Sequence, residues 1–154
     1  MDQLNYHCSI NINIPVRKAF KSVSNDISAW WAPNFEGSAQ NLDDVFTVSF
    51  GESTVTIQTV GIVPLKKILW RVIDCTHPWI DEKAEWRDTK IVWEFRAGNN
   101  STHIGMTHIG LVPEIKCYAD SALEWDFLIK EKLVKLLIQS NALPEIADSR
   151  LVLS

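Results

Sequence analysis

The sequence predicts a single α+β domain, residues 1–154, in which a curved antiparallel sheet packs on one long C-terminal helix. Segments with alternating apolar and polar residues occupy most of the chain from residue 6 to residue 113, and turn-forming residues bound each of them. Residues 118–144 instead carry apolar residues at helical spacing. A length of 154 residues with 46% hydrophobic content fits one core of ordinary size.

The chain begins with a strand that leads into two short helices. Residues 6–15 read YHCSININIP, which alternates between apolar and polar positions and predicts a half-buried strand. Pro15 suits the first turn of a helix, because its missing amide hydrogen is not needed there, and an apolar stripe follows over residues 16–23. Asp26 is a plausible N-cap for a second short helix, which ends before Pro33.

Five further segments predict consecutive antiparallel strands, and one predicts the long helix. Each of the five segments is enriched in β-branched residues or alternates between apolar and polar residues with a period of two. The segments are residues 44–51, 53–64, 66–75, 89–98 and 101–113. The helix is expected to run from Tyr118 to Ser140. Its apolar stripe consists of Ala122, Trp125, Ile129, Leu133 and Leu136. Because no other element is long enough to cover the apolar face of the sheet, the sheet is expected to curl around this helix.

The alternation within each strand assigns an aromatic interior. Arg71, Glu94 and Arg96 share strand faces that should meet water, so their neighbours of opposite parity point inward. These inward residues are Trp70, Trp93, Phe95, Phe46, Val48 and Phe50. In residues 101–109, Ile104, Met106 and His108 share one parity, so the interior also receives an imidazole. A cavity between sheet and helix is the candidate site.

Trp30 and Trp31 stand side by side in the stretch DISAWWAPNFEG. Adjacent residues on a helical turn point about 100° apart, so one core does not easily accept both indoles. We therefore expect one of the two to anchor the helix and the other to line the cavity entrance. Phe35 would flank that entrance, and the acidic segment 76–89, with its two tryptophans, would form a loop or a lid over it.

Composition excludes several classes of function. The net charge of −4, with no basic run longer than two lysines, argues against nucleic-acid binding. No apolar stretch approaches the length of a membrane span, and the first residues lack the pattern of a secretory signal, so a cytoplasmic location is expected. Three widely spaced cysteines indicate reduced thiols. His103 and His108 have opposite parity, and Cys75 with His77 supplies only two ligands, so no metal site is expected.

Four stretches resemble the helix-grip fold of the START-like (SRPBCC) superfamily, and in particular small bacterial members of its heat-shock ATPase activator-homologue branch. They are residues 14–31, 35–51, 63–74 and 107–126, which together cover nearly the whole chain. The resemblance implies a curved antiparallel sheet wrapped around the C-terminal helix, with two short helices after the first strand. It brings no catalytic motif, and Ser121 stands where relatives often carry a second cysteine after the CY pair.

Three functions remain open at this stage. The first is binding of a small hydrophobic or aromatic molecule in the cavity, without a cofactor and without a catalytic residue. Its expected ligand contacts are Trp30, Trp31, Phe46, Phe50, Trp70, Trp93, Phe95, Met106, His108 and Trp125. The second is regulation of a protein partner, as in chaperone ATPase activators. The third is a cyclase- or hydrolase-like enzyme that uses His108 as its acid–base, although an orienting acid and a nucleophile are not evident. The oligomeric state is open as well.

Overall fold

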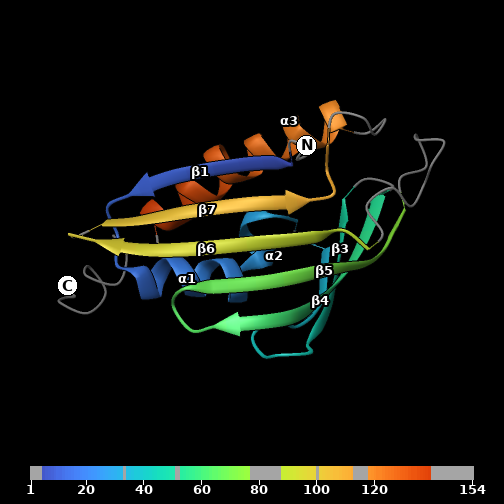
Figure 1. Ribbon diagram of the computed structural model, residues 1–154, viewed down its shortest axis with the longest axis horizontal. Helices are drawn as coiled ribbons and strands as arrows, with labels where there is room; N and C mark the ends of the chain where they lie inside the picture. Colours follow the sequence, from blue (N-terminus) through green and yellow to red (C-terminus); the bar gives the residue numbers. More distant parts are fainter. Residues whose placement is uncertain are drawn as a thin grey trace.

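A computed structural model describes residues 5–32, 34–50, 53–76, 88–99, 101–112 and 118–139 of the chain. One antiparallel sheet forms the body of the molecule, and the helices pack on one of its faces (Figure 1). The strands are β1 (Tyr6–Ile12), β2 (Asn34–Gly37), β3 (Val45–Phe50), β4 (Ser53–Val63), β5 (Lys67–Thr76), β6 (Lys90–Gly98) and β7 (Ser101–Ile109). The helices are α1 (Val16–Asn25), α2 (Ile27–Trp30) and α3 (Tyr118–Phe127), and α3 continues as the π-helical segment η1 (Leu128–Leu133) and an α-helical turn to residue 139.

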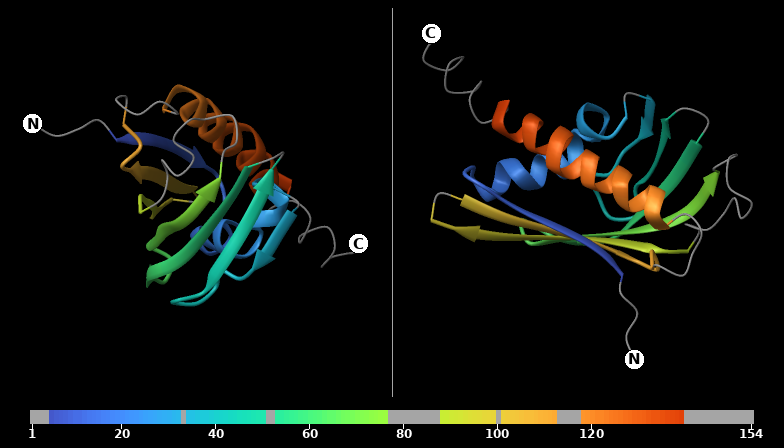
Figure 2. Two further views of the ribbon diagram at one scale, coloured as in Figure 1. Left: turned by 90° about the vertical axis from the view of Figure 1, so that its right-hand side faces the viewer. Right: turned by 90° about the horizontal axis from the view of Figure 1, so that it is seen from above.

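The sheet order is β1-β7-β6-β5-β4-β3-β2, so the first strand pairs with the last. In this pairing Tyr6 lies opposite His108 and Ile12 lies opposite Thr102. Strands β2 to β7 follow one another as antiparallel neighbours. The C-terminal helix crosses the concave face, while β3 and β4 bend away from the plane of β6 and β7 (Figure 2). Two register shifts between β4 and β5 add to the bend, because a bulge increases local twist. This arrangement fits the helix-grip fold.

The predicted inward faces are confirmed for the described strands. Trp70, Trp93 and Met106 are fully buried. On β3, Phe46 and Val48 are at most 1% exposed. Arg71, Glu94 and Arg96 on the opposite faces are exposed, as their charges require. The side chain of Phe50 lies outside the described residues. Burial therefore follows the period-two pattern that the sequence displays.

Strand β2 was not expected from the sequence. It has only four residues, three of them exposed, so no alternation marks it. It forms because its backbone pairs with β3, with Phe35 opposite Val48. Gly37 closes the strand at φ 105°, and a Cβ at this position would lie only 2.3 Å from the carbonyl oxygen of Val45. A side chain cannot be accommodated there, which fixes glycine at this position.

The long C-terminal helix begins at Tyr118 as predicted, but its buried stripe shifts along the helix. Trp125, Ile129 and Leu133 are buried as expected, whereas Leu137 takes the next buried position and Leu136 is only half-buried. The cause is η1, whose wider turns rotate the residues that follow it relative to an α-helix. Among the described residues, no helix combines the length and apolar character that crossing a membrane requires.

Candidate functional site

Five tryptophans and one phenylalanine form a continuous aromatic cluster between the sheet and the C-terminal helix. Its members are Trp30, Trp31, Phe46, Trp70, Trp93 and Trp125. They come from α2 and the residue after it, from strands β3, β5 and β6, and from α3. Neighbouring ring centroids lie between 5.1 and 6.4 Å apart. At these separations aromatic rings are in contact, so the rings pack directly on one another.

Both members of the adjacent pair belong to this cluster. Trp30 and Trp31 stack with centroids 5.7 Å apart and planes 20° apart. Trp30 packs edge-to-face on Trp93 of the sheet, whereas Trp31 contacts Trp125 of the helix. Trp31 is only 4% exposed, so the expectation that one indole lines an open entrance is not met in this structure. The reason is that α2 lies between two apolar layers, the sheet and the C-terminal helix. The two indoles point in different directions, and both are covered by other side chains.

His108 on β7 connects the cluster to the segment before β6. The indole Nε1–H of Trp125 donates a hydrogen bond to Nδ1 of His108 over 3.1 Å. Because an indole nitrogen can only donate, Nδ1 carries no proton in this arrangement, and the ring proton resides on Nε2. Nε2 then donates to Oγ1 of Thr89, 2.8 Å away. The imidazole is therefore held in one neutral tautomer.

Burial keeps this imidazole neutral. His108 is fully buried, and loss of solvation lowers its pKa from 6.5 to about 3. Thr89 is fixed in turn by the backbone around it, since its carbonyl accepts from the amide of Val72 and its side chain fills the space beside Gly110. A general base needs a pKa near the working pH and access to substrate. With both ring nitrogens engaged, His108 is a positioning residue for Trp125, and the geometry gives an acid–base role no support.

Three buried polar atoms in the interior have no hydrogen-bond partner within the described part of the chain. They are Nε1 of Trp70, Nε1 of Trp93 and Oγ1 of Thr59. Thr59 lies opposite Trp70 in the β4–β5 pairing, and the rings of Trp70 and Trp93 are 5.7 Å apart. All three side chains are fully buried. An unsatisfied buried donor or acceptor costs roughly 1–3 kcal/mol, so these atoms mark the polar part of the candidate site.

Most of the expected ligand contacts lie in the aromatic cluster or next to it, but not all of them do. Met106 lies opposite Trp93 in the β6–β7 pairing and so adjoins the cluster. Phe95 packs on Phe20 of α1, with centroids 5.2 Å apart, which places it toward α1. The loop tryptophans expected at the entrance lie in residues 77–87, outside the described residues. Sequence reasoning missed Thr59, although its parity within β4 matches the buried Val55 and Ile57.

A polar contact between β1 and α3 was also missed. The hydroxyl of Tyr6 donates to Oδ1 of Asp126 over 2.5 Å. Burial, reinforced by this hydrogen bond, raises the pKa of Tyr6 well above its usual range, and burial likewise raises the pKa of Cys8. Cys8 is therefore an unreactive thiol at neutral pH. No sequence pattern predicts the contact between Tyr6 and Asp126, because the two residues lie so far apart along the chain.

A groove of about 450 Å³ opens on the surface between α2 and the C-terminal helix. Ala29 borders it on one side, and Phe127, Lys132 and Leu136 border it on the other. None of the ten expected ligand contacts lines it. Within the described ranges, no three His, Cys, Asp or Glu side chains gather in a way that could hold a metal ion.

The comparisons with known proteins support the fold. No family model and no curated protein matches the sequence. Among solved structures, the chain is similar to Aha1 from Colwellia psychrerythraea, described as a dimer, at 18% identity and a TM-score of 0.72, covering 87% of this chain and 96% of Aha1. It is also similar to CalU16 from Micromonospora echinospora, at 12% identity and a TM-score of 0.65, covering 90% and 76% of the two chains.

A third similar structure is DynU16, a protein of the dynemicin biosynthetic locus, at 14% identity and a TM-score of 0.67. The match covers 88% of this chain but only 47% of DynU16, so this chain corresponds to about half of that protein. Identities this low establish the three-dimensional arrangement and not the activity. The chain therefore has a START-like fold.

Proposed function

We propose that this protein binds a small, mainly apolar molecule between the sheet and the C-terminal helix, and that the molecule carries at least one hydrogen-bond acceptor. The observation behind this proposal is the pair of unsatisfied indole donors, Nε1 of Trp70 and Nε1 of Trp93. Both are fully buried, on neighbouring strands, among aromatic rings. A carbonyl or ether oxygen of a ligand would accept from one or both.

The proposed ligand has to part the aromatic rings, because these rings contact one another in this structure. Two features of the C-terminal helix favour such a movement. Its π-helical segment η1 directly follows the turn that carries Trp125, and π-helical turns are frequent at functional sites. Leu128, Ile129 and Leu133 of η1 face the core, so a change in η1 would widen the same space. Ligand binding is thus coupled to the geometry of this helix.

The groove between α2 and η1 is the proposed entry route. Ala29 at its edge directly precedes Trp30, so the groove adjoins the paired tryptophans. Phe127 offers an apolar surface at the opening and is 55% exposed. A ligand arriving there would meet apolar contacts first and the buried indole donors last. The residues named from the sequence remain the proposed contacts, except for Phe95, which packs on Phe20 of α1, and Thr59 is added to them.

Native mass spectrometry of tag-free protein, purified from its own host, tests this function. The expected spectrum contains a species heavier than the apoprotein by the mass of a small molecule, which organic extraction releases. Trp70→Phe and Trp93→Phe keep a ring but remove the free donor, so each should lower the retained fraction. Trp30→Phe is the matched control, since the indole of Trp30 already donates to the carbonyl of Ser22 at 3.1 Å. A spectrum of apoprotein alone would count against the proposal.

A further inference from the structure

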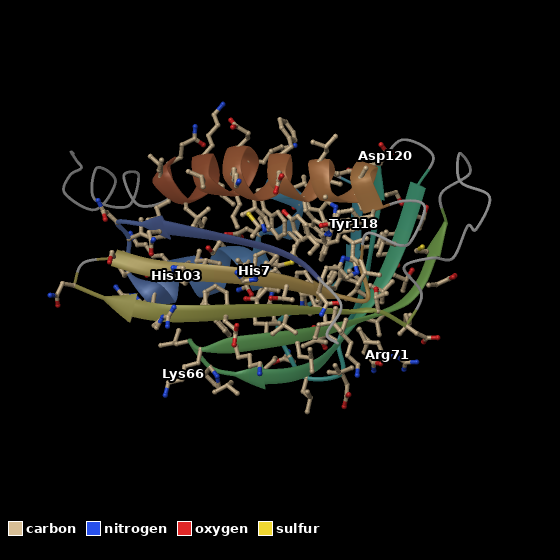
Figure 3. All side chains as sticks on the ribbon, turned by 45° about the horizontal axis from the view of Figure 1, so that its top comes forward. His7, Lys66, Arg71, His103, Tyr118 and Asp120 are labelled. Carbon is tan, nitrogen blue, oxygen red and sulfur yellow. The ribbon has the colours of Figure 1, made fainter. Side chains whose placement is uncertain are left out.

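The outer face of the sheet, on the side away from the aromatic cluster, carries a second polar cluster. His7 on β1 and His103 on β7 lie on neighbouring strands there (Figure 3). His7 points outward because its neighbours Tyr6 and Cys8 on β1 are buried. His103 points to the same face because its neighbours Thr102 and Ile104 on β7 are buried. The sequence did not pair these two histidines, since they lie far apart along the chain and meet only through the β1–β7 pairing.

Each imidazole is held through its Nδ1 atom. Nδ1 of His7 lies 2.8 Å from Oγ1 of Thr107, and Nδ1 of His103 lies 2.9 Å from Oδ1 of Asn11. Asparagine Oδ1 only accepts, so His103 uses its Nδ1 proton for this bond. The Nε2 atoms of both rings are thereby oriented by the sheet itself.

Both Nε2 atoms border the same empty space, above Gly105. A Cβ added to Gly105 would lie 3.5 Å from Cε1 of His7 and 4.0 Å from Nε2 of each histidine. Gly105 lies between His103 and Thr107 on the outer face of β7, and it borders a hollow of about 330 Å³. The two imidazoles therefore border this hollow together.

The border of the hollow is cationic, although the protein as a whole carries a net charge of −4. Lys66 from the β4–β5 turn and Arg96 from β6 border it together with the histidines. Glu94 is the one acid on this border, and the β5–β6 pairing places Lys67 directly opposite it. When the imidazoles are protonated, their Nε2–H groups are donors aimed into the hollow, because their Nδ1 atoms are already engaged.

We propose that this outer-face hollow binds an oxyanion, the phosphate or carboxylate group of a small molecule. Imidazolium, guanidinium and ammonium groups are the side chains that recognise such anions through charge-assisted hydrogen bonds. A transition-metal ion is the less suitable occupant, because Lys66 and Arg96 would repel it and the described residues supply no group of three ligands. This site is independent of the proposed apolar site, which lies on the other face of the sheet.

NMR titration with inorganic phosphate at about pH 6 tests the proposal. Sodium chloride at equal ionic strength is the blank. Saturable shifts are expected for the backbone amide of Gly105 and the ring signals of His7 and His103, and the same titration with acetate compares the two anion classes. Gly105→Ala should weaken binding about tenfold. Its Cβ meets only ordinary van der Waals contacts, so the fold is retained.

Two lysine variants distinguish specific phosphate binding in the hollow from a general effect of the protein's charge. Lys66→Ala removes a charge from the border of the hollow, and Lys90→Ala removes one from an exposed position on β6 that does not border it. Only the first should weaken phosphate binding. Equal weakening by both variants, or shifts that chloride reproduces, would overturn the proposal. So would saturable binding of Zn²⁺ at these histidines in the absence of any response to phosphate or acetate.

Discussion

The hydroxyl of Tyr6 and the carboxylate of Asp126 join the first strand to the C-terminal helix through a hydrogen bond of 2.5 Å. Tyr6 is 4% exposed, so solvent barely competes for its hydroxyl. Because β1 is an edge strand next to β7, this contact ties the edge of the sheet to the helix that covers it. A hydrogen bond of this kind, to a charged group, contributes roughly 1.5–3 kcal/mol to stability.

Tyr6→Phe should therefore lower the free energy of unfolding by roughly 1.5–3 kcal/mol, because Asp126 loses its donor while the packing of the ring is kept. Urea denaturation followed by circular dichroism measures this change. Tyr118→Phe, at the half-buried start of α3, is the matched control and should cost less. If the two variants were equally stable, the bond from Tyr6 to Asp126 would contribute nothing specific.

Trp125 should be the most costly side chain of α3 to truncate. It is 1% exposed, and Trp125→Ala leaves a large cavity and removes the donor to Nδ1 of His108, so a loss of about 3–5 kcal/mol is expected. Trp125→Phe keeps most of the volume and removes the donor, and it should cost about 1–3 kcal/mol. Chemical denaturation distinguishes the two. A loss under about 1 kcal/mol for the alanine variant would show that Trp125 is not a core residue.

His108 should make the fold acid-sensitive. Its pKa is lowered to about 3 in the folded state from 6.5, so the unfolded chain binds more protons between these values. Its contribution to stability is complete above about pH 6.5 and declines as the pH falls toward 3, by up to about 1.4 kcal/mol per pH unit.

His108→Gln provides the test of this titration, because glutamine does not titrate but can accept from Trp125 and donate to Thr89. The wild type should be the more stable protein at neutral pH, and its advantage should shrink below about pH 6.5. Denaturation curves at several pH values give this difference. An advantage that is constant from pH 7 to 4 would contradict a neutral, buried His108.

Trp30→Ala and Trp31→Ala should both lower the melting temperature strongly. Each indole is at most 4% exposed, and truncation of a buried tryptophan costs about 3–5 kcal/mol. Differential scanning calorimetry measures both variants. A melting temperature unchanged by either substitution would show that this indole lies at the surface, as an entrance residue would.

Much of the fold could be predicted because the determining signals are local. Alternation along each strand placed Trp70, Trp93 and His108 inside, and helical spacing located the helix from Tyr118. Strand β2 escaped prediction because four mostly exposed residues carry no periodic signal, and only pairing with β3 makes them a strand. The rotation of the stripe to Leu137 depends on the π-helical hydrogen bonds of η1, which no residue spacing reveals.

The candidate site was predictable in its residues but not in its bonds. The alternation of residues along each strand predicted which aromatic side chains face the interior. It could not show that the core accommodates both Trp30 and Trp31, because this depends on α2 lying between two apolar layers. It also could not show that His108 is bonded at both nitrogens, since Thr89 and Trp125 come from other elements. The outer-face hollow requires the β1–β7 register, which only the folded sheet defines.

The most direct test of the proposed function is the indole region of a ¹H–¹⁵N correlation spectrum, recorded while acetophenone is added and compared with ethylbenzene, a hydrocarbon of similar size without an acceptor. The donors of Trp70 and Trp93 are free to bond the ketone oxygen, whereas that of Trp30 is bonded to Ser22. We expect saturable downfield shifts of the Trp70 and Trp93 signals with acetophenone only, and a Trp30 signal that moves little. Unchanged Trp70 and Trp93 signals, or identical responses to both probes, would contradict an interior site that recognises an acceptor.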